Sequence, residues 1–178
     1  WANKGKVDGM IGVWHTSERA RNFLFSDPIT PNQMILYKRK DSNFEFISYD
    51  DIKQKELVIG GVIGYAYPKG IQESGARITS VSSESHNFKL LSEKRVDLII
   101  VDQDFAAHYL NQSNNLRYLH VIEPVGPVLE SRDQHLVISN SIESPREIID
   151  AFNLGLSELK QSGELQRIID SHRLLSSD

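Results

Sequence analysis

The chain has 178 residues, with 20 Lys and Arg against 24 Asp and Glu and a formal net charge of -4, so a nucleic-acid or anionic-membrane surface is not expected. It has no cysteine, which excludes disulfides, thiolate metal sites and a cysteine nucleophile. No apolar run approaches the ~20 residues that cross a bilayer. The chain begins at Trp1 without an initiator Met, which predicts that it is a processed or trimmed piece of a longer product.

The first predicted elements meet at a corner. A mostly apolar run at residues 7–14 predicts a short buried strand, and the polar residues from His15 onward mark the start of a helix. Thr16 is a good N-cap residue, and Phe23 follows at helical spacing. The free N–H groups of such a corner attract anions, and Arg19 would add a planar, bidentate partner for a carboxylate or phosphate. The alternative is that Arg19 is one more solvated helical charge.

The middle of the chain alternates predicted strands and helices. An extended segment at 33–39 is followed by a short helix that Ser48 caps. Strands are predicted at 57–63, 77–82 and 96–101, and helices near 65–72 and at 83–94 and 104–111. This alternation predicts a parallel sheet with helical crossovers.

The C-terminal part begins with an extended connector at 116–128, which Pro124, Gly126 and Pro127 interrupt. A last strand is predicted at 134–139, and helices are predicted at 146–161 and 164–172. Extended segments thus enter and leave the block at 38–119. A lobe inserted into another lobe through two crossovers is suited to hinge bending.

Four motifs carry a resemblance to a known family: GKVDGMIG, TSERARNFLFSDPI, VDLIIVD and ELKQSGELQRIID. With them the chain resembles the type 2 periplasmic binding proteins, specifically the bacterial extracellular solute-binding proteins of family 3, which serve amino-acid ABC transporters. The resemblance implies an α/β fold of two lobes, each a mostly parallel sheet flanked by helices. Lobe 1 would comprise 1–37 and 120–178 and lack its first strand, helix and strand. Lobe 2 would comprise 38–119, with hinge crossovers near 33–39 and 117–128.

The resemblance also implies a ligand site. Arg19 would grip the α-carboxylate of the ligand with help from Thr16, and Asp102 would receive its α-ammonium. Asp102 ends an apolar strand at the edge where open α/β sheets place ligand groups, which favours ligand contact, and the same residue could also cap the helix that follows.

Two positions depart from the family pattern and add aromatic surface. Trp14 stands where the family has a small hydroxyl residue, and its carbonyl can still accept a hydrogen bond. Gly64 is followed by Tyr65 and Ala66 instead of a hydroxyl residue. Tyr65 would offer its backbone N–H to an anion and its ring to the site, or else simply pack in the fold; Trp14 has the same two alternatives. The departures favour a larger or less polar ligand than an ordinary amino acid.

The function expected from the resemblance is a periplasmic or otherwise extracytoplasmic solute-binding protein. It would capture a small carboxylate-bearing solute between two lobes for the membrane subunits of an ABC transporter, without a cofactor, a metal or enzymatic activity. The six histidines have no metal-ligand spacing. One alternative is the sensing domain of a signalling receptor. Another is an enzyme similar to cyclohexadienyl dehydratase, for which Glu18, Glu84 and Asp102 are available carboxylates without a recognisable catalytic pair.

Overall fold

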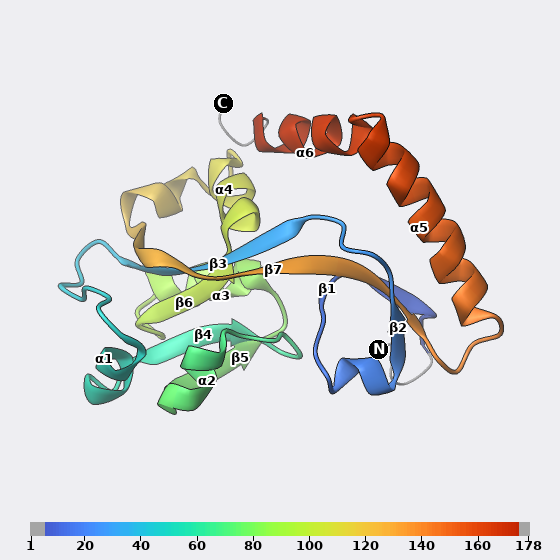
Figure 1. The fold of residues 1–178 in the computed structure, drawn as a ribbon. Coiled ribbons are helices and arrows are strands. Elements are labelled where there is room, and N and C mark those ends of the chain that lie inside the picture. The colour runs from blue at the N-terminus through green and yellow to red at the C-terminus, as the bar shows by residue number, and fades with distance from the viewer. Residues whose placement is uncertain (1–5, 175–178) are drawn as a thin grey trace. The chain divides into compact units, whose positions relative to one another are not determined.

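The fold was obtained as a computed structural model that describes residues 6–174, with side chains up to Ser171 (Figure 1). The predicted α/β class is confirmed. In chain order the elements are β1 (Gly9–Trp14), η2 (Arg19–Arg21), β2 (Phe23–Phe25), β3 (Pro31–Arg39), α1 (Tyr49–Gln54), β4 (Val58–Val62), α2 (Lys69–Ser74), β5 (Arg77–Val81), α3 (Glu84–Ser92), β6 (Leu98–Asp102), α4 (Gln103–Asn111), η3 (Leu116–His120), β7 (Ile122–Ser139), α5 (Pro145–Gln161) and α6 (Glu164–Leu174).

The described residues form two compact units. Unit 1 combines the chain up to Asn32 with Arg132–His172, and unit 2 combines Gln33–Ser131 with Arg173 and Leu174 at the end of α6. Strands β3 and β7 therefore each pass from one unit into the other. The ends of the predicted lobe 1, residues 1–5 and 175–178, lie outside the described residues.

Unit 2 is built on a sheet whose strand order is β3-β6-β4-β5. Strand β4 pairs in parallel with both β5 and β6, as the alternating pattern predicted, and β3 pairs antiparallel with β6. Every side chain of Leu98–Val101 is buried, which explains the continuous apolar run of β6. The carboxyl ends of β4, β5 and β6 consequently lie at one edge of this sheet.

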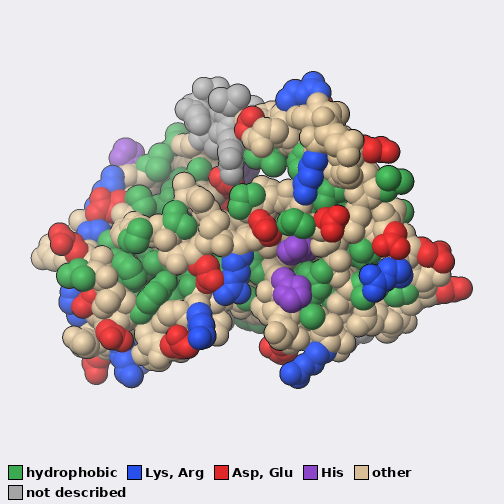
Figure 2. Space-filling view, viewed as in Figure 1, with side chains coloured by type: hydrophobic (Ala, Val, Ile, Leu, Met, Phe, Trp, Pro, Cys, Tyr) green, Lys and Arg blue, Asp and Glu red, His purple; other side chains and the backbone are tan. Residues whose placement is uncertain are grey.

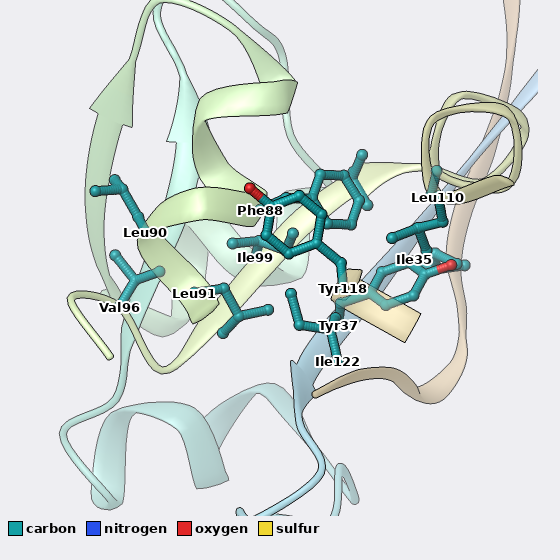
Figure 3. Packing of buried hydrophobic residues seen from close by; sticks show 12 residues of the cluster. Ile35, Tyr37, Phe88, Leu90, Leu91, Val96, Ile99, Leu110, Tyr118 and Ile122 are labelled. Atoms are coloured by element: carbon teal, nitrogen blue, oxygen red, sulfur yellow. The ribbon is translucent and has the colours of Figure 1, made fainter. Parts of the chain in front are cut away.

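The core of unit 2 has Phe88 of α3 at its centre (Figure 3). This side chain is fully buried, and its ring centroid lies 5.0 Å from that of Tyr109 and 5.8 Å from that of Tyr37. The surrounding buried residues include Ile35, Leu90, Leu91, Val96, Ile99, Leu110, Tyr118 and Ile122. Burying an aromatic ring of this size contributes about 1.5–3 kcal/mol. The packing fixes α3, and with it the residues at the start of α3, on the sheet.

Unit 1 contains the first corner. Strands β1 and β2 both pair antiparallel with β7, whereas the sequence predicted a mostly parallel sheet in each lobe. The prediction that Phe23 continues a helix is wrong. Phe23 begins β2 opposite Ser139, and its side chain is buried against Val13 and Val137. Burial in this apolar cluster outweighs the helical spacing of the segment.

Two further boundaries differ from the prediction. The connector and the last predicted strand form one continuous strand, β7. Strands β1 and β2 pair only with the C-terminal part of β7, so Pro124 and Pro127 lie outside these two pairings and do not interrupt their hydrogen bonds. Helix α2 begins at Lys69, later than predicted. The prediction that Ser48 caps a short helix is confirmed, and Ser48 forms a capping box with Asp51 at the start of α1. The two predicted C-terminal helices are also confirmed. Within residues 6–174, no helix combines the length and apolarity needed to span a membrane.

Candidate functional site

The corner after β1 forms a single helical turn. The Thr16 hydroxyl accepts a hydrogen bond from the backbone N–H of Arg19 at 3.2 Å, and the Thr16 carbonyl accepts one from Ala20 at 3.0 Å. Thr16 therefore caps the turn, although the helix that follows is only the 3-10 segment η2. The capping geometry places Arg19 at the start of this turn.

Arg19 is held at the end of β1. Its Nη1 donates a hydrogen bond to the carbonyl of Trp14 at 3.0 Å, and its side chain is half-buried. Burial lowers the pKa of the guanidinium from its ordinary value, while the carboxylate of Glu18 opposes the shift. Arginine stays protonated under such shifts, so a charged planar group is fixed here by a backbone contact. A guanidinium in this position can bind a carboxylate through two parallel hydrogen bonds.

Trp14 lies inside unit 1. Its side chain is only 5% exposed, and its Nε1 donates to the Oδ1 of Asn32 at 2.8 Å. The guanidinium of Arg132 lies 5.1 Å from the centroid of the indole ring. The indole is thus housed by residues of its own unit, while the Trp14 carbonyl contacts Arg19.

Asp102 is the last residue of β6 and the N-cap of α4. Its Oδ1 accepts a hydrogen bond from the backbone N–H of Phe105 at 2.5 Å. The capping role that the sequence left open is therefore observed. Its position at the carboxyl end of a parallel strand is where α/β sheets bind ligands.

Glu84 lies beside Asp102, and sequence analysis did not pair these two carboxylates. The Oε1 of Glu84 accepts a hydrogen bond from the backbone N–H of Asp102 at 3.4 Å. Burial, with a smaller contribution from the Asp102 charge, raises the pKa of Glu84 to about 7, against the opposing effect of that hydrogen bond. Glu84 follows β5 and Asp102 ends β6, and only β4 lies between these two strands in the sheet. This strand order, which the sequence does not give, brings the two residues into contact.

The segment after β4 carries the two other predicted residues of unit 2. Gly64 has a positive φ of 80°, and the N–H of Tyr65 donates to the carbonyl of Val62 at 3.2 Å. The expectation that this N–H is available for an anion is therefore not met, because the tight turn uses it. The Tyr65 side chain is 49% exposed, and burial followed by the charges of Glu84 and Asp102 raises the pKa of its phenol. Its ring accordingly lies near both carboxylates.

Tyr67 contacts the end of β4, just before this segment, and was not singled out in the sequence. Its hydroxyl hydrogen-bonds to both the N–H and the carbonyl of Val62, at the end of β4. Burial of the phenol raises the pKa of Tyr67 to about 12. A buried tyrosine with a backbone partner is a structural residue that positions the end of β4.

A pocket of about 300 Å³ lies elsewhere in unit 2, lined by Ser48, Tyr49, Asp50, Gly70, Glu73 and Ser74. None of the predicted site residues lines it. Among residues 6–171, no group of three His, Asp or Glu side chains is arranged to hold a metal ion. On the face shown in Figure 2, Lys and Arg side chains are interspersed with Asp and Glu.

The fold is that of the type 2 periplasmic binding proteins. A mutant of ArgBP from T. maritima matches with a TM-score of 0.78 and 22% identity, covering 95% of this chain and 70% of that chain. AbpA from Streptococcus pneumoniae bound to L-arginine matches with a TM-score of 0.78 and 19% identity, covering 99% and 72%. The ligand-binding core of GluR0 from Nostoc punctiforme in complex with L-glutamate matches with a TM-score of 0.74 and 23% identity, covering 95% and 74%.

The family itself follows from the sequence match. The chain belongs to the bacterial extracellular solute-binding proteins, family 3, whose model matches residues 1–173. A curated relative is the L-cystine-binding protein TcyA of Bacillus subtilis (strain 168), which is 24% identical over 170 residues. That match covers 93% of this chain and 58% of TcyA, so the chain spans somewhat more than half of that relative's length.

Proposed function

We propose that the protein carrying this chain is a periplasmic or otherwise extracytoplasmic solute-binding protein that captures an amino acid or a related carboxylate for the membrane subunits of an ABC transporter. Membership of the extracellular solute-binding family supports the class of function. The similar proteins include one named for binding L-cystine and others solved with L-arginine or L-glutamate, which supports the class of ligand. The observation that carries the proposal is the half-buried Arg19, held by the Trp14 carbonyl.

Unit 1 would bind the carboxylate of the solute. Arg19 supplies a charged, planar donor, and Thr16 fixes the turn on which Arg19 stands. Trp14 contributes mainly by orienting Arg19 through its carbonyl, since its indole is buried against residues of its own unit. A charge-assisted, bidentate pair is worth roughly 1.5–3 kcal/mol or more in net terms.

Unit 2 would bind the ammonium of the solute through Asp102, with Gly64 and Tyr65 beside it. The carboxyl ends of parallel strands favour this use of Asp102, and its cap on α4 fixes the orientation of its carboxylate. The Tyr65 ring offers a half-exposed apolar wall. Gly64 makes the tight turn that presents this ring.

The two units would act as lobes that close on the solute. Both β3 and β7 pass from one unit to the other, between Asn32 and Gln33 and between Ser131 and Arg132. We place the hinge in these two strands; the first crossing adjoins the expected crossover near 33–39, and the second lies just beyond the expected crossover near 117–128. A solute that contacts both lobes stabilises the closed state by its difference in affinity for the two states.

Arg19→Ala in the full-length protein tests the proposal. Isothermal titration calorimetry with a panel of L-amino acids, including arginine, glutamine, glutamate and cystine, should show binding that is at least about tenfold weaker than in the wild type. Arg21→Ala is the matched control, because Arg21 ends the same helical turn with an exposed side chain. Equal affinities for the wild type and Arg19→Ala would contradict the proposal.

A second candidate is a dehydratase-like enzyme, and the Glu84–Asp102 contact favours it. A carboxyl group with a pKa of about 7 is suited to act as a general acid near neutral pH. Incubation of the protein with prephenate, followed by mass spectrometry, would detect turnover. Loss of any such turnover in Glu84→Gln would support the enzyme, and an unchanged substrate would exclude this reaction.

A further inference from the structure

Two carboxylates meet at the carboxyl ends of the parallel strands of unit 2. Asp102 ends β6, and Glu84 opens α3 just after β5. Because β4 lies between these two strands, the side chain of Glu84 reaches across the end of β4 to contact the backbone of Asp102. The contact joins two helix starts and lies at the edge where we place the ammonium of the solute.

The groups that face Glu84 are acidic or neutral. Asp102 approaches from the junction of β6 and α4, and the phenols of Tyr65 and Tyr67 approach from the segment after β4. Both phenols have pKa values raised above 10, so they are uncharged near neutral pH. Glu84 has no ion-pair partner among residues 6–171, and no cationic group contributes to its pKa shift.

The charge of this edge therefore changes near neutral pH. Burial raises the pKa of Glu84 to about 7, so Glu84 is mainly uncharged below this pH and mainly ionised above it. A bound cation favours the ionised form of Glu84, and its arrival expels the proton into solvent.

On the basis of the proposed function, we infer that Glu84 is a specificity-determining residue. Glu84 and Asp102 together form a binding site of two carboxylates, and this site selects amino acids with a second positive charge once Glu84 has lost its proton. A neutral amino acid offers one ammonium, which Asp102 alone can balance. A dibasic amino acid offers a further cation, and a second carboxylate in a partly buried site is the group that balances it. Selectivity between the two classes should then depend on pH.

The experiment compares L-arginine with L-glutamine by calorimetry at pH 5.5 and pH 8 on the full-length protein. Both amino acids keep their own charges over this interval, so a change in their affinity ratio reports on the protein. In the wild type, the preference for arginine should rise on the order of tenfold from pH 5.5 to pH 8. In Glu84→Gln it should change less than about twofold. Glu93→Gln, at the exposed end of the same helix, should behave as the wild type.

Calorimetry of arginine binding at pH 7 in two buffers of different ionisation enthalpy supplies a second readout. The wild type should release protons on binding, and Glu84→Gln should not. A pH-independent ratio in the wild type, or the same pH dependence in Glu84→Gln, would overturn the role of Glu84 while leaving amino-acid binding established. Failure of every amino acid to bind the wild type would overturn the proposed function and this inference together.

Discussion

Gly60 of β4 and Asn87 of α3 form a close contact whose energetics can be measured. A Cβ atom added at Gly60 would lie 2.7 Å from the Oδ1 of Asn87 and 3.0 Å from a methyl carbon of Ile99. Asn87 is 1% exposed, and neither polar atom of its side chain has a hydrogen-bond partner among residues 6–171. Gly60 therefore leaves the space that the Asn87 side chain occupies, and burial of the Asn87 amide without hydrogen bonds adds little to the stability of the fold.

The expected free-energy changes follow from this geometry. Gly60→Ala should lower the free energy of unfolding by about 1–3 kcal/mol, because the new methyl group overpacks a rigid helix–sheet contact. Asn87→Ala removes a buried amide whose desolvation costs about 1–3 kcal/mol, and it leaves a cavity of similar cost, so its net effect should be within about 1 kcal/mol. The double variant should lose less than Gly60→Ala alone, with a coupling free energy of about 1–2 kcal/mol.

Urea denaturation followed by circular dichroism measures all four free energies of the cycle. Gly61→Ala provides a matched control, because a Cβ at Gly61 would meet the hydroxyl of Tyr67 instead of Asn87. Asn87→Ala should not rescue Gly61→Ala. Additivity of Gly60→Ala and Asn87→Ala within about 0.5 kcal/mol would refute the argument. A loss of more than about 3 kcal/mol in Asn87→Ala would also refute it, because it would show that the amide is well hydrogen-bonded.

Two further predictions concern the edge of the same sheet. The pKa of Glu84 is raised from 4.5 to about 7 on folding, so the stability that its protonated form contributes is fully present below pH 4.5 and is lost as the pH rises through 7. Thermal denaturation should therefore show Glu84→Gln melting above the wild type at pH 8 and level with it at pH 4.5; equal melting temperatures at pH 8 would contradict the burial argument. Tyr67→Phe removes the hydroxyl that bonds both backbone groups of Val62, and urea denaturation should show a loss of about 1–3 kcal/mol. In Tyr65→Phe, where the side chain is half-exposed, the free energy of unfolding should fall by less than about 0.5 kcal/mol. Equal losses in the two variants would rule out a structural role of the Tyr67 hydroxyl at Val62.

The corner of unit 1 shows what could be predicted from the sequence. Thr16 and Arg19 are close in the chain, so the hydrogen bond between them depends on local geometry alone. The same holds for the Trp14 carbonyl, which was expected to remain an acceptor and receives a hydrogen bond from Arg19. Local capping rules were sufficient for Thr16, whereas the contact of Arg19 with the Trp14 carbonyl was not predicted.

Phe23 shows where local rules fail. Its spacing fitted a helix, but its partner in the sheet is Ser139, and its burial depends on Val137 from the same distant strand. No local pattern contains that information. The same reason explains why Pro124 was expected to interrupt a strand that in fact continues through it.

The contact between Glu84 and Asp102 also required the three-dimensional structure. In the sequence Glu84 has the appearance of an ordinary first-turn acid of a helix capped by Ser83. Its proximity to Asp102 depends on which strands are neighbours, and its pKa depends on burial that neighbouring elements provide. The sequence identified Glu84 and Asp102 as separate carboxylates but did not predict the contact between them.

The division of the chain has a consequence for biosynthesis. Apart from the end of α6, unit 2 is formed by one continuous segment, Gln33–Ser131, so the strands and helices of that segment are available once the ribosome has passed Ser131. Unit 1 needs Arg132–His172 to complete β7 and to add α5, so its N-terminal strands wait for a partner that is translated later. During that interval β1 and β2 lack β7, the strand with which both pair and whose Val137 covers Val13 and Phe23.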